Sequence, residues 1–191
     1  MASVNNAFRW VCTQEDWVRA NQLANIRIPN EYRRDGRLDT PQRIEKIAIG
    51  YAGEFAFQLW CRENEINMEY LGEVITETAD DGDFRTEDGQ TLDVKTQEVL
   101  YMPEDNWRCE VTSEQINRPI DIYVFAKLFK TLTRRTVYIC GWMRHDEFRE
   151  RSTFHPRGTI LKGRPVHYDK YDVLISQLND LNSLRDLCRP N

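Results

Sequence analysis

Two closely spaced apolar runs constrain the fold of this chain more than any other feature. They are DIYVFAKLF at residues 121–129 and TVYICGWM at residues 136–143. Both are dense in β-branched and aromatic residues, which favour β-strands. Because only the short basic turn KTLTRR separates them, the pattern predicts two adjacent strands at the centre of a sheet.

A long helix is predicted upstream of these strands. Thr40 followed by Pro41 is typical of a helix start, because a capping hydroxyl is followed by a residue whose amide needs no partner. From there, apolar residues recur at helical spacing to about Arg62.

The other segments with a clear pattern are shorter. Helices are predicted at residues 13–25 (with Thr13 as N-cap), 144–152 and 174 onward. Strands are predicted at residues 66–75, 81–97 and 107–112. Loops are predicted at residues 28–37 and 155–165. A helix, a mixed sheet and a closing helix predict an α/β or α+β layered domain. With 191 residues, 40% of them hydrophobic, we expect one domain, divided into an N-terminal extension (1–38), a core (40–143), and a basic loop with a C-terminal helix (144–191).

The composition excludes several classes of protein. No run of about 18 apolar residues is present, which excludes a membrane span. The N-terminus MASVNNAFRW lacks the basic and apolar segments of a signal peptide. The five cysteines form no CxxC pair, which argues against zinc ribbons, iron–sulfur clusters and a disulfide framework. We expect reduced, buried thiols in a cytoplasmic protein.

The distribution of charge is more informative than its sum. A net charge of −5 argues, taken alone, against a nucleic-acid partner. Residues 122–170, however, hold 11 Lys and Arg against 4 Asp and Glu, together with all three histidines. A basic segment on an acidic protein is compatible with a ligand that carries phosphate groups, and also with an ordinary solvated face.

The segment DGDFRTEDGQTLDVKTQ at residues 81–97 carries the most informative polar side chains. In its second half, side chains alternate between two faces, so Asp93, Lys95 and Gln97 share one face and the apolar residues between them share the other. A three-residue loop ending in a left-handed Gly89 pairs Asp83 with Asp93, whereas a two-residue loop would bury Asp83 on the core side. The sequence therefore favours Asp83, Asp93 and Lys95 on one face. There the two opposed carboxylates repel each other unless a cation lies between them.

The long helix adds a fourth group. On a helical projection, Glu54 falls beside Ile47 at the edge of the buried stripe. Gly50 and Gly53 lie just before it and would let another backbone approach closely. A glutamate in this position can reach a site at the sheet edge, or can simply flank the buried face.

This order of residues resembles a known family. Glu54 on a helix, then Asp83, then Asp93-Val94-Lys95 after a hairpin, is similar to the PD-(D/E)xK nuclease superfamily. In that family the second strand carries the Asp, the third strand carries the (D/E)-x-K, and a helix supplies a further acid. The resemblance implies the restriction-endonuclease-like fold, a mixed central β-sheet flanked by helices.

The resemblance covers roughly residues 43–142 and departs from the family pattern at Gly82, where many members have proline. It implies a nuclease that hydrolyses phosphodiester bonds with Mg²⁺ or Mn²⁺, which prefer hard oxygen ligands. The implied metal ligands are Asp83, Asp93, the Val94 carbonyl and Glu54.

Two further residues have expected roles at this site. Lys95 would orient or help deprotonate the attacking water, or neutralise the phosphate. Gln97 shares its face and could touch the phosphate or the ligands of the metal.

Nucleic acid is the implied partner, with DNA favoured over RNA; no membrane partner is expected, and a homodimer is compatible with the sequence. Basic residues after position 126 would hold the phosphate backbone: Lys127, Lys130, Arg134, Arg135, Arg144, Arg157, Lys162 and Arg164.

Other interpretations stay open. A calcium loop starting at Asp81 fails, because its sixth position is Thr86 where glycine is required. A solvated acidic hairpin, with Lys95 as an ordinary salt-bridge partner, remains an alternative. So do a catalytically inactive nucleic-acid-binding protein and a protein that works through protein contacts. The three histidines are too far apart for a ligand pair, and we interpret them as phosphate contacts or bystanders.

Overall fold

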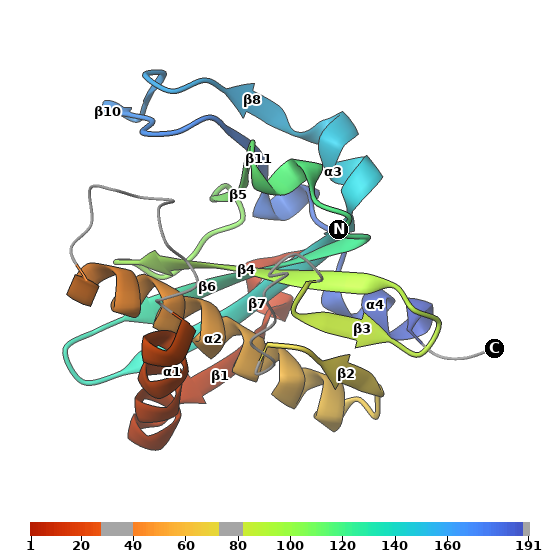
Figure 1. The fold of residues 1–191 in the computed structure, drawn as a ribbon. Coiled ribbons are helices and arrows are strands. Elements are labelled where there is room, and N and C mark those ends of the chain that lie inside the picture. The colour runs from red at the N-terminus through yellow and green to blue at the C-terminus, as the bar shows by residue number, and fades with distance from the viewer. Residues whose placement is uncertain (28–39, 73–81, 189–191) are drawn as a thin grey trace.

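The computed structural model describes residues 1–27, 40–72 and 82–188. Its helices, drawn in Figure 1, are α1 (Gln14–Arg27), α2 (Thr40–Glu63), α3 (His145–Arg151) and α4 (Leu181–Leu187). Its strands are β1 (Phe8–Cys12), β2 (Met68–Tyr70), β3 (Phe84–Thr86), β4 (Thr91–Val99), β5 (Arg108–Thr112), β6 (Ile122–Lys130), β7 (Arg135–Arg144), β8 (Thr153–His155), β9 (Ile160–Leu161), β10 (Arg164–Pro165) and β11 (Lys170–Leu174).

Six strands form a mixed central sheet in the order β1-β7-β6-β4-β3-β2. Strand β6 pairs antiparallel with β7 on one side and parallel with β4 on the other. The two apolar runs predicted as adjacent central strands are β6 and β7, so that prediction is confirmed. Both faces of these two strands are buried, which explains why their apolar residues are nearly continuous.

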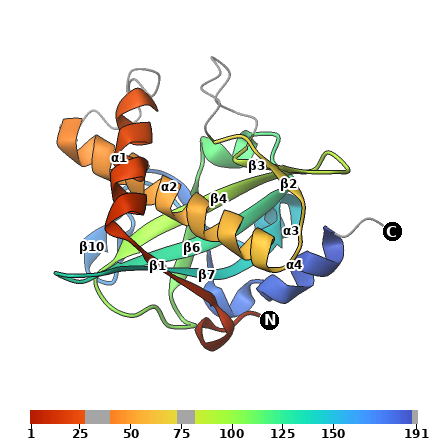
Figure 2. The ribbon, with the colours of Figure 1, turned by 90° about the horizontal axis from the view of Figure 1, so that it is seen from below.

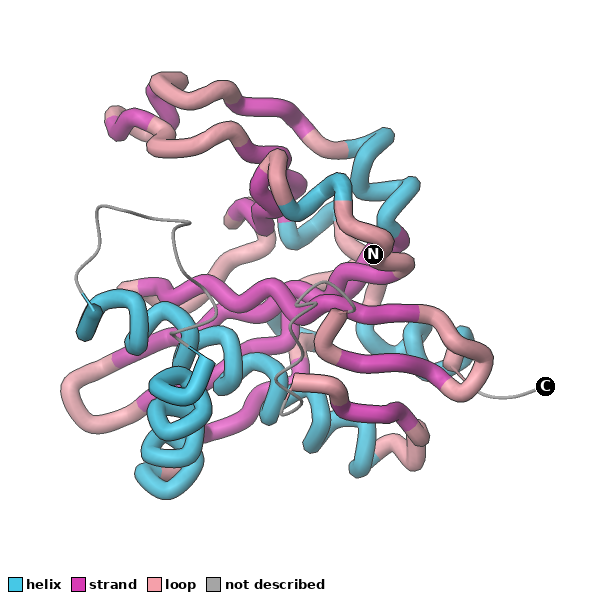
Figure 3. The backbone as a smooth tube through the Cα atoms, viewed as in Figure 1, coloured by secondary structure: helices cyan, strands magenta, loops and turns pink. Residues whose placement is uncertain are grey.

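Two layers cover this sheet, as Figures 1 and 2 show from two directions. Helix α2 packs along one face, with α1 outside it, and Phe57 of α2 is buried against Leu92 and Val124 of the sheet. The other face is covered by α3 and by a small antiparallel sheet of order β5-β11-β8. Figure 3 makes the division visible, because the long helical segments lie below the central strands and the small sheet lies above them.

The predicted helices before the strands are confirmed. Thr13 caps α1: its hydroxyl accepts a hydrogen bond from the Asp16 amide at 3.1 Å, and the Asp16 carboxylate accepts one from the Thr13 amide at 2.9 Å. Helix α2 begins at Thr40 and continues to Glu63. The loop predicted at residues 28–37 lies outside the described residues.

The helix predicted from Leu174 to the C-terminus is wrong over its first part. Leu174 ends strand β11, a 3₁₀ turn follows at Ile175–Gln177, and α4 begins only at Leu181. A strand followed by a 3₁₀ turn buries Ile175 and Leu178 at nearly the interval that a helix would. Apolar spacing alone therefore did not distinguish the two arrangements.

Three other segments differ from the expectations. Strand β1 carries no strong sequence signal, yet it pairs along β7 and extends the central sheet. The strand at residues 107–112 is present as β5, but it belongs to the small sheet. The segment 155–165, expected to be a loop, contains the β9–β10 hairpin, whose two turn residues Lys162 and Gly163 have φ values of 50° and 76°.

All five cysteines are free, as expected; four are buried and Cys188 is half-buried. Burial raises the pKa of the Cys12 thiol to about 11. Within the described ranges, no helix combines the length and the apolar character that crossing a membrane requires.

Candidate active site

The β3–β4 hairpin has the register that its loop residues predict. The Thr86 amide donates to the Gln90 carbonyl at 2.9 Å, which closes a three-residue loop ending in Gly89 at φ 88°. Phe84 pairs with Leu92 and Arg85 with Thr91 in this register, and Asp83, just before β3, donates its amide to the Leu92 carbonyl at 2.7 Å. The hairpin therefore places the Asp83 carboxylate near that of Asp93, at the point where β3 begins.

Asp83 is fixed to the backbone of β4. Its carboxylate accepts a hydrogen bond from the Val94 amide at 2.7 Å. Because the N–H and C=O of one strand residue point to the same edge, the Val94 carbonyl also lies on this edge. The preceding Gly82 has φ 81°, a conformation that proline, with φ fixed near −65°, cannot adopt. The departure from the family pattern at this position thus has a local structural reason.

Lys95 and Asp93 form an ion pair on the face of β4 that looks toward the small sheet. Both side chains are largely buried, with 14% and 10% of their surface exposed. The Lys95 ammonium also lies 5.9 Å from the centre of the Tyr123 ring. The amine is therefore held beside the carboxylates.

Glu54 reaches the same place from helix α2. A Cβ at Gly53 would lie 1.8 Å from the Thr96 hydroxyl, so glycine is needed for α2 to rest on β4. The close approach expected at Gly50 is not seen, since a Cβ there would meet only the Glu54 carboxylate, at 4.0 Å. Glu54 itself is 4% exposed, and its carboxylate accepts a hydrogen bond from the Tyr70 hydroxyl at 2.7 Å.

Burial and mutual repulsion dominate the electrostatics of these acids. Burial, opposed by the Tyr70 hydroxyl and Arg27 and reinforced by Asp93, raises the pKa of Glu54 to about 7. Burial, followed by the nearby carboxylates of Glu54 and Asp93, raises the pKa of Asp83 well above its ordinary value. The carboxylates of Glu54 and Asp93 thus lie close enough to disfavour the ionised form of Asp83.

These groups line one cavity of about 590 Å³. Helix α2 supplies Glu54 and Lys46, strand β4 supplies the residues from Asp93 onward, and β5 supplies Glu110. Its lining residues come from α2, β4 and β5, so the cavity lies between α2 and the small sheet. It is large enough to hold part of a polymeric substrate beside the acids.

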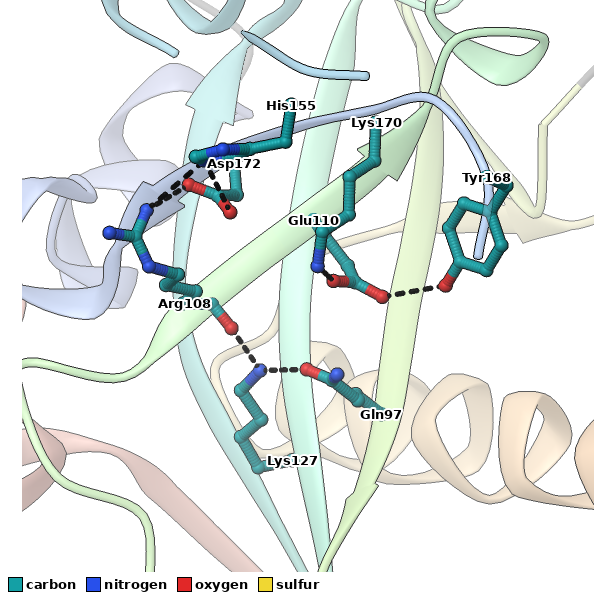
Figure 4. A network of polar contacts seen from close by, with 8 residues as sticks. All are labelled: Gln97, Arg108, Glu110, Lys127, His155, Tyr168, Lys170 and Asp172. Carbon is teal, nitrogen blue, oxygen red and sulfur yellow. Dashed lines mark hydrogen bonds and ion pairs between the residues drawn. The ribbon is translucent and has the colours of Figure 1, made fainter. Parts of the chain in front are cut away.

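Gln97 also lines the cavity and is tied into a polar network that Figure 4 shows. Its side-chain oxygen accepts a hydrogen bond from the Lys127 ammonium at 2.5 Å, and the same ammonium donates to the Arg108 carbonyl at 2.6 Å. Arg108 in turn pairs with the fully buried Asp172, whose other oxygen lies 3.2 Å from the ring of His155. The network joins β4 and β6 of the central sheet to the small sheet.

The eight basic residues expected to hold phosphates differ in exposure and in their contacts. Lys127 is 2% exposed, Lys130 pairs with Glu45 at 2.6 Å, and the Arg135 guanidinium lies 4.1 Å from the centre of the Trp17 ring. Three others are exposed and lie on or beside the β9–β10 hairpin: Arg157, Lys162 and Arg164. No carboxylate of the described ranges lies within ion-pair distance of their charged groups. Arg134 is exposed in the β6–β7 turn, and Arg144 is half-buried at the end of β7.

The three histidines do not come together. The ring of His145 is hydrogen-bonded to the Ile116 carbonyl at 2.7 Å, His155 contacts Asp172, and His167 is exposed. Sequence reasoning also did not identify Tyr70, whose hydroxyl holds Glu54. That contact joins two elements 16 residues apart, and no spacing rule predicts it.

The donors fit a hard divalent cation in kind. Asp93 is buried and Asp83 is half-buried near it, the Val94 carbonyl lies on the strand edge that Asp83 contacts, and Glu54 is close by. Of the side chains that the structure describes, no three His, Cys, Asp or Glu already converge as a ready set of ligands. Instead, the Lys95 ammonium pairs with Asp93, and the Val94 amide donates to Asp83.

Comparison with known proteins adds no relative: no protein-family model matches the sequence, and no curated protein matches it either. The chemistry of the site must therefore be argued from its own geometry.

Proposed function

We propose that this protein is a metal-dependent nuclease of the PD-(D/E)xK type, which hydrolyses phosphodiester bonds of nucleic acid. One observation carries the proposal: the hairpin holds the Asp83 carboxylate against the backbone of β4, near Asp93 and Lys95, beside a cavity. An ordinary solvated hairpin would leave such charges in water, whereas Asp93 is buried, Asp83 is half-buried, and the nearby carboxylates of Glu54 and Asp93 raise the pKa of Asp83.

The order of elements supports the same proposal. Counted from helix α2, Asp83 precedes the second strand, and Asp93 and Lys95 lie in the third. Helix α2 also supplies Glu54, which fits the further acid of the family. The parallel partner strand β6 and the helical layer of α1 and α2 are compatible with a restriction-endonuclease-like core.

The residues suit the steps of phosphodiester hydrolysis. Asp83, Asp93 and the Val94 carbonyl would hold Mg²⁺ or Mn²⁺, with Glu54 as a further ligand. When bound, such a cation lowers the pKa of a bound water and offsets charge on the phosphate. Lys95 would orient the attacking water by hydrogen bonding and neutralise charge that develops on the phosphate oxygens.

The proposed substrate is DNA in preference to RNA, held by its backbone. Of the basic residues, Arg157, Lys162 and Arg164 are the best placed to meet phosphates, since they are exposed on or beside the β9–β10 hairpin and their charged groups form no ion pair with a described carboxylate.

A cleavage assay on several substrates tests the proposal. Plasmid, linear duplex, single-stranded DNA and RNA are incubated with the purified protein in Mg²⁺, in Mn²⁺ or in EDTA. We expect at least one substrate to be cut with metal and none in EDTA. Absence of cutting together with absence of Mn²⁺ binding would contradict the proposal and favour a non-catalytic protein.

A further inference from the structure

Lys127 is a buried cation with no carboxylate partner among the residues that the structure describes. It lies in the middle of β6 with 2% of its surface exposed. The hydrogen-bond partners of its ammonium are the side-chain oxygen of Gln97 and the backbone carbonyl of Arg108, and both are neutral. In the described parts of the chain, no carboxylate lies within ion-pair distance of this ammonium.

Such an arrangement is unfavourable unless something else supplies negative charge. Removing an ammonium from water costs several kcal/mol, and neutral hydrogen-bond acceptors recover only part of that cost. An ammonium has three N–H groups, and the two protein acceptors use two of them. Because Lys127 lines the cavity, its remaining N–H can reach a ligand there.

Gln97 is oriented by the same contact. Since Lys127 can only donate, the oxygen of the Gln97 amide must face it, and the NH₂ group must face away. Figure 4 shows the amide nitrogen on the side opposite Lys127. Gln97 also lines the cavity, so its NH₂ group is a second donor beside the ammonium.

We propose that Lys127 and Gln97 form a binding subsite for a phosphate group at the β5 side of the cavity. The subsite lies on the same strand face as Lys95, one alternating position along β4, or about 6.6 Å away. Asp93 lies two alternating positions from Gln97, or about 13 Å, so a nucleic-acid strand whose reacting phosphate lies beside Asp83 and Asp93 would place a phosphate further along the same strand here. The inference deepens the proposed function and rests on it for the substrate, but anion binding at this subsite requires neither metal nor cleavage.

Thermal unfolding with inorganic phosphate in EDTA tests the subsite directly. For the wild type we expect Tm to rise by roughly 5 °C at saturating phosphate. Lys127→Met should lose this rise, and should have an equal or higher Tm without phosphate because an uncompensated buried charge is removed. Lys130→Met is the matched control on the same strand, since Lys130 already pairs with Glu45, and it should keep the rise.

A second variant keeps the test decisive if Lys127→Met folds poorly. Gln97→Glu has nearly the same shape and gives Lys127 an internal counter-charge. It should raise Tm in the absence of phosphate and reduce the further rise that phosphate produces. Equal phosphate-induced shifts in the wild type and in both variants, or an adventitious shift that Lys130→Met alone removes, would overturn the proposal.

Short oligothymidylates identify the source of the phosphate. Their affinity is measured by fluorescence anisotropy in EDTA, with and without a terminal phosphate. If only the phosphorylated form loses affinity at least five-fold in Lys127→Met, the subsite binds a strand end. If both forms lose it, the subsite binds an internal phosphodiester. No loss for either form would overturn the inference, whether or not the protein proves to be a nuclease.

Discussion

The amide of Val94 donates a 2.7 Å hydrogen bond to the carboxylate of Asp83, which precedes it by 11 residues. This contact exists only in the hairpin register that follows from a three-residue loop. It anchors the Asp83 carboxylate to the backbone of β4, the strand that carries Asp93 and Lys95 of the proposed site. The register of a short hairpin thus decides whether the site can form.

Replacing Asp83 should weaken metal binding without unfolding the protein. In Asp83→Asn the amide oxygen can still accept from Val94, but the negative charge is gone. We expect Mn²⁺ affinity, measured by calorimetry, to fall at least about ten-fold. Asp88→Asn removes a charge from the loop of the same hairpin, outside the cavity, and serves as the control. Unchanged Mn²⁺ affinity in Asp83→Asn would contradict the assignment.

The stability of the metal-free protein should depend on the ionisation of Glu54. Its pKa rises from 4.5 to about 7 on folding, so in that interval the folded state retains a proton that the unfolded chain releases. The free energy of unfolding should therefore decrease as pH increases from 4.5 to 7, by on the order of 3 kcal/mol from this group. Urea unfolding in EDTA measures it. Glu54→Gln should lack this component, and identical pH profiles for both proteins would refute the prediction.

Replacing two glycines of helix α2 by alanine should change the free energy of unfolding in opposite directions. At Gly53 an added Cβ would collide with the Thr96 side chain at 1.8 Å, so we expect a loss of about 1–3 kcal/mol in the free energy of unfolding. At Gly50 the nearest atom would be 4.0 Å away, and alanine should stabilise the helix by roughly 0.5–1 kcal/mol. Chemical denaturation of both variants tests the packing of α2 on β4, which fails if Gly53→Ala is as stable as Gly50→Ala.

The β9–β10 hairpin should contribute to the salt dependence of nucleic-acid binding. Replacing Arg157, Lys162 and Arg164 by glutamine should reduce the slope of log affinity against log salt by about 2–3. Lys130→Gln should change it little, because that ammonium pairs with Glu45 and lies 3.8 Å from Glu98. Affinities are measured in EDTA at several salt concentrations. An unchanged slope in the triple variant would show that the strand takes another path.

Much of the proposed site could be predicted because local rules govern it. Strand alternation placed Asp93 and Lys95 on one face, the left-handed glycine at position 89 set the register, and helical periodicity put Glu54 near the sheet. Each of these rules involves only residues close in sequence. The central strands β6 and β7 were predictable for the same reason.

The features that were missed depend on distant segments. Lys127 was expected at the surface as one of several basic residues, yet β5 covers it through the Arg108 carbonyl, 19 residues upstream. Strand β1 is recognisable only from its pairing with β7, more than a hundred residues later. In the C-terminal segment, a strand and a 3₁₀ turn matched the apolar spacing of a helix, and only tertiary pairing of β11 with β5 and β8 distinguishes them.

The role of Lys95 tests the central claim most directly. The measurement is the initial rate of cleavage at saturating Mn²⁺, for the wild type and for Lys95→Ala, on whichever substrate the wild type cuts. We expect a loss of at least about 10²-fold in rate for the variant, with Mn²⁺ binding retained through the unchanged acids. A Lys95→Ala protein that cuts at the wild-type rate would contradict the account, because the buried lysine would then be only a salt-bridge partner of Asp93.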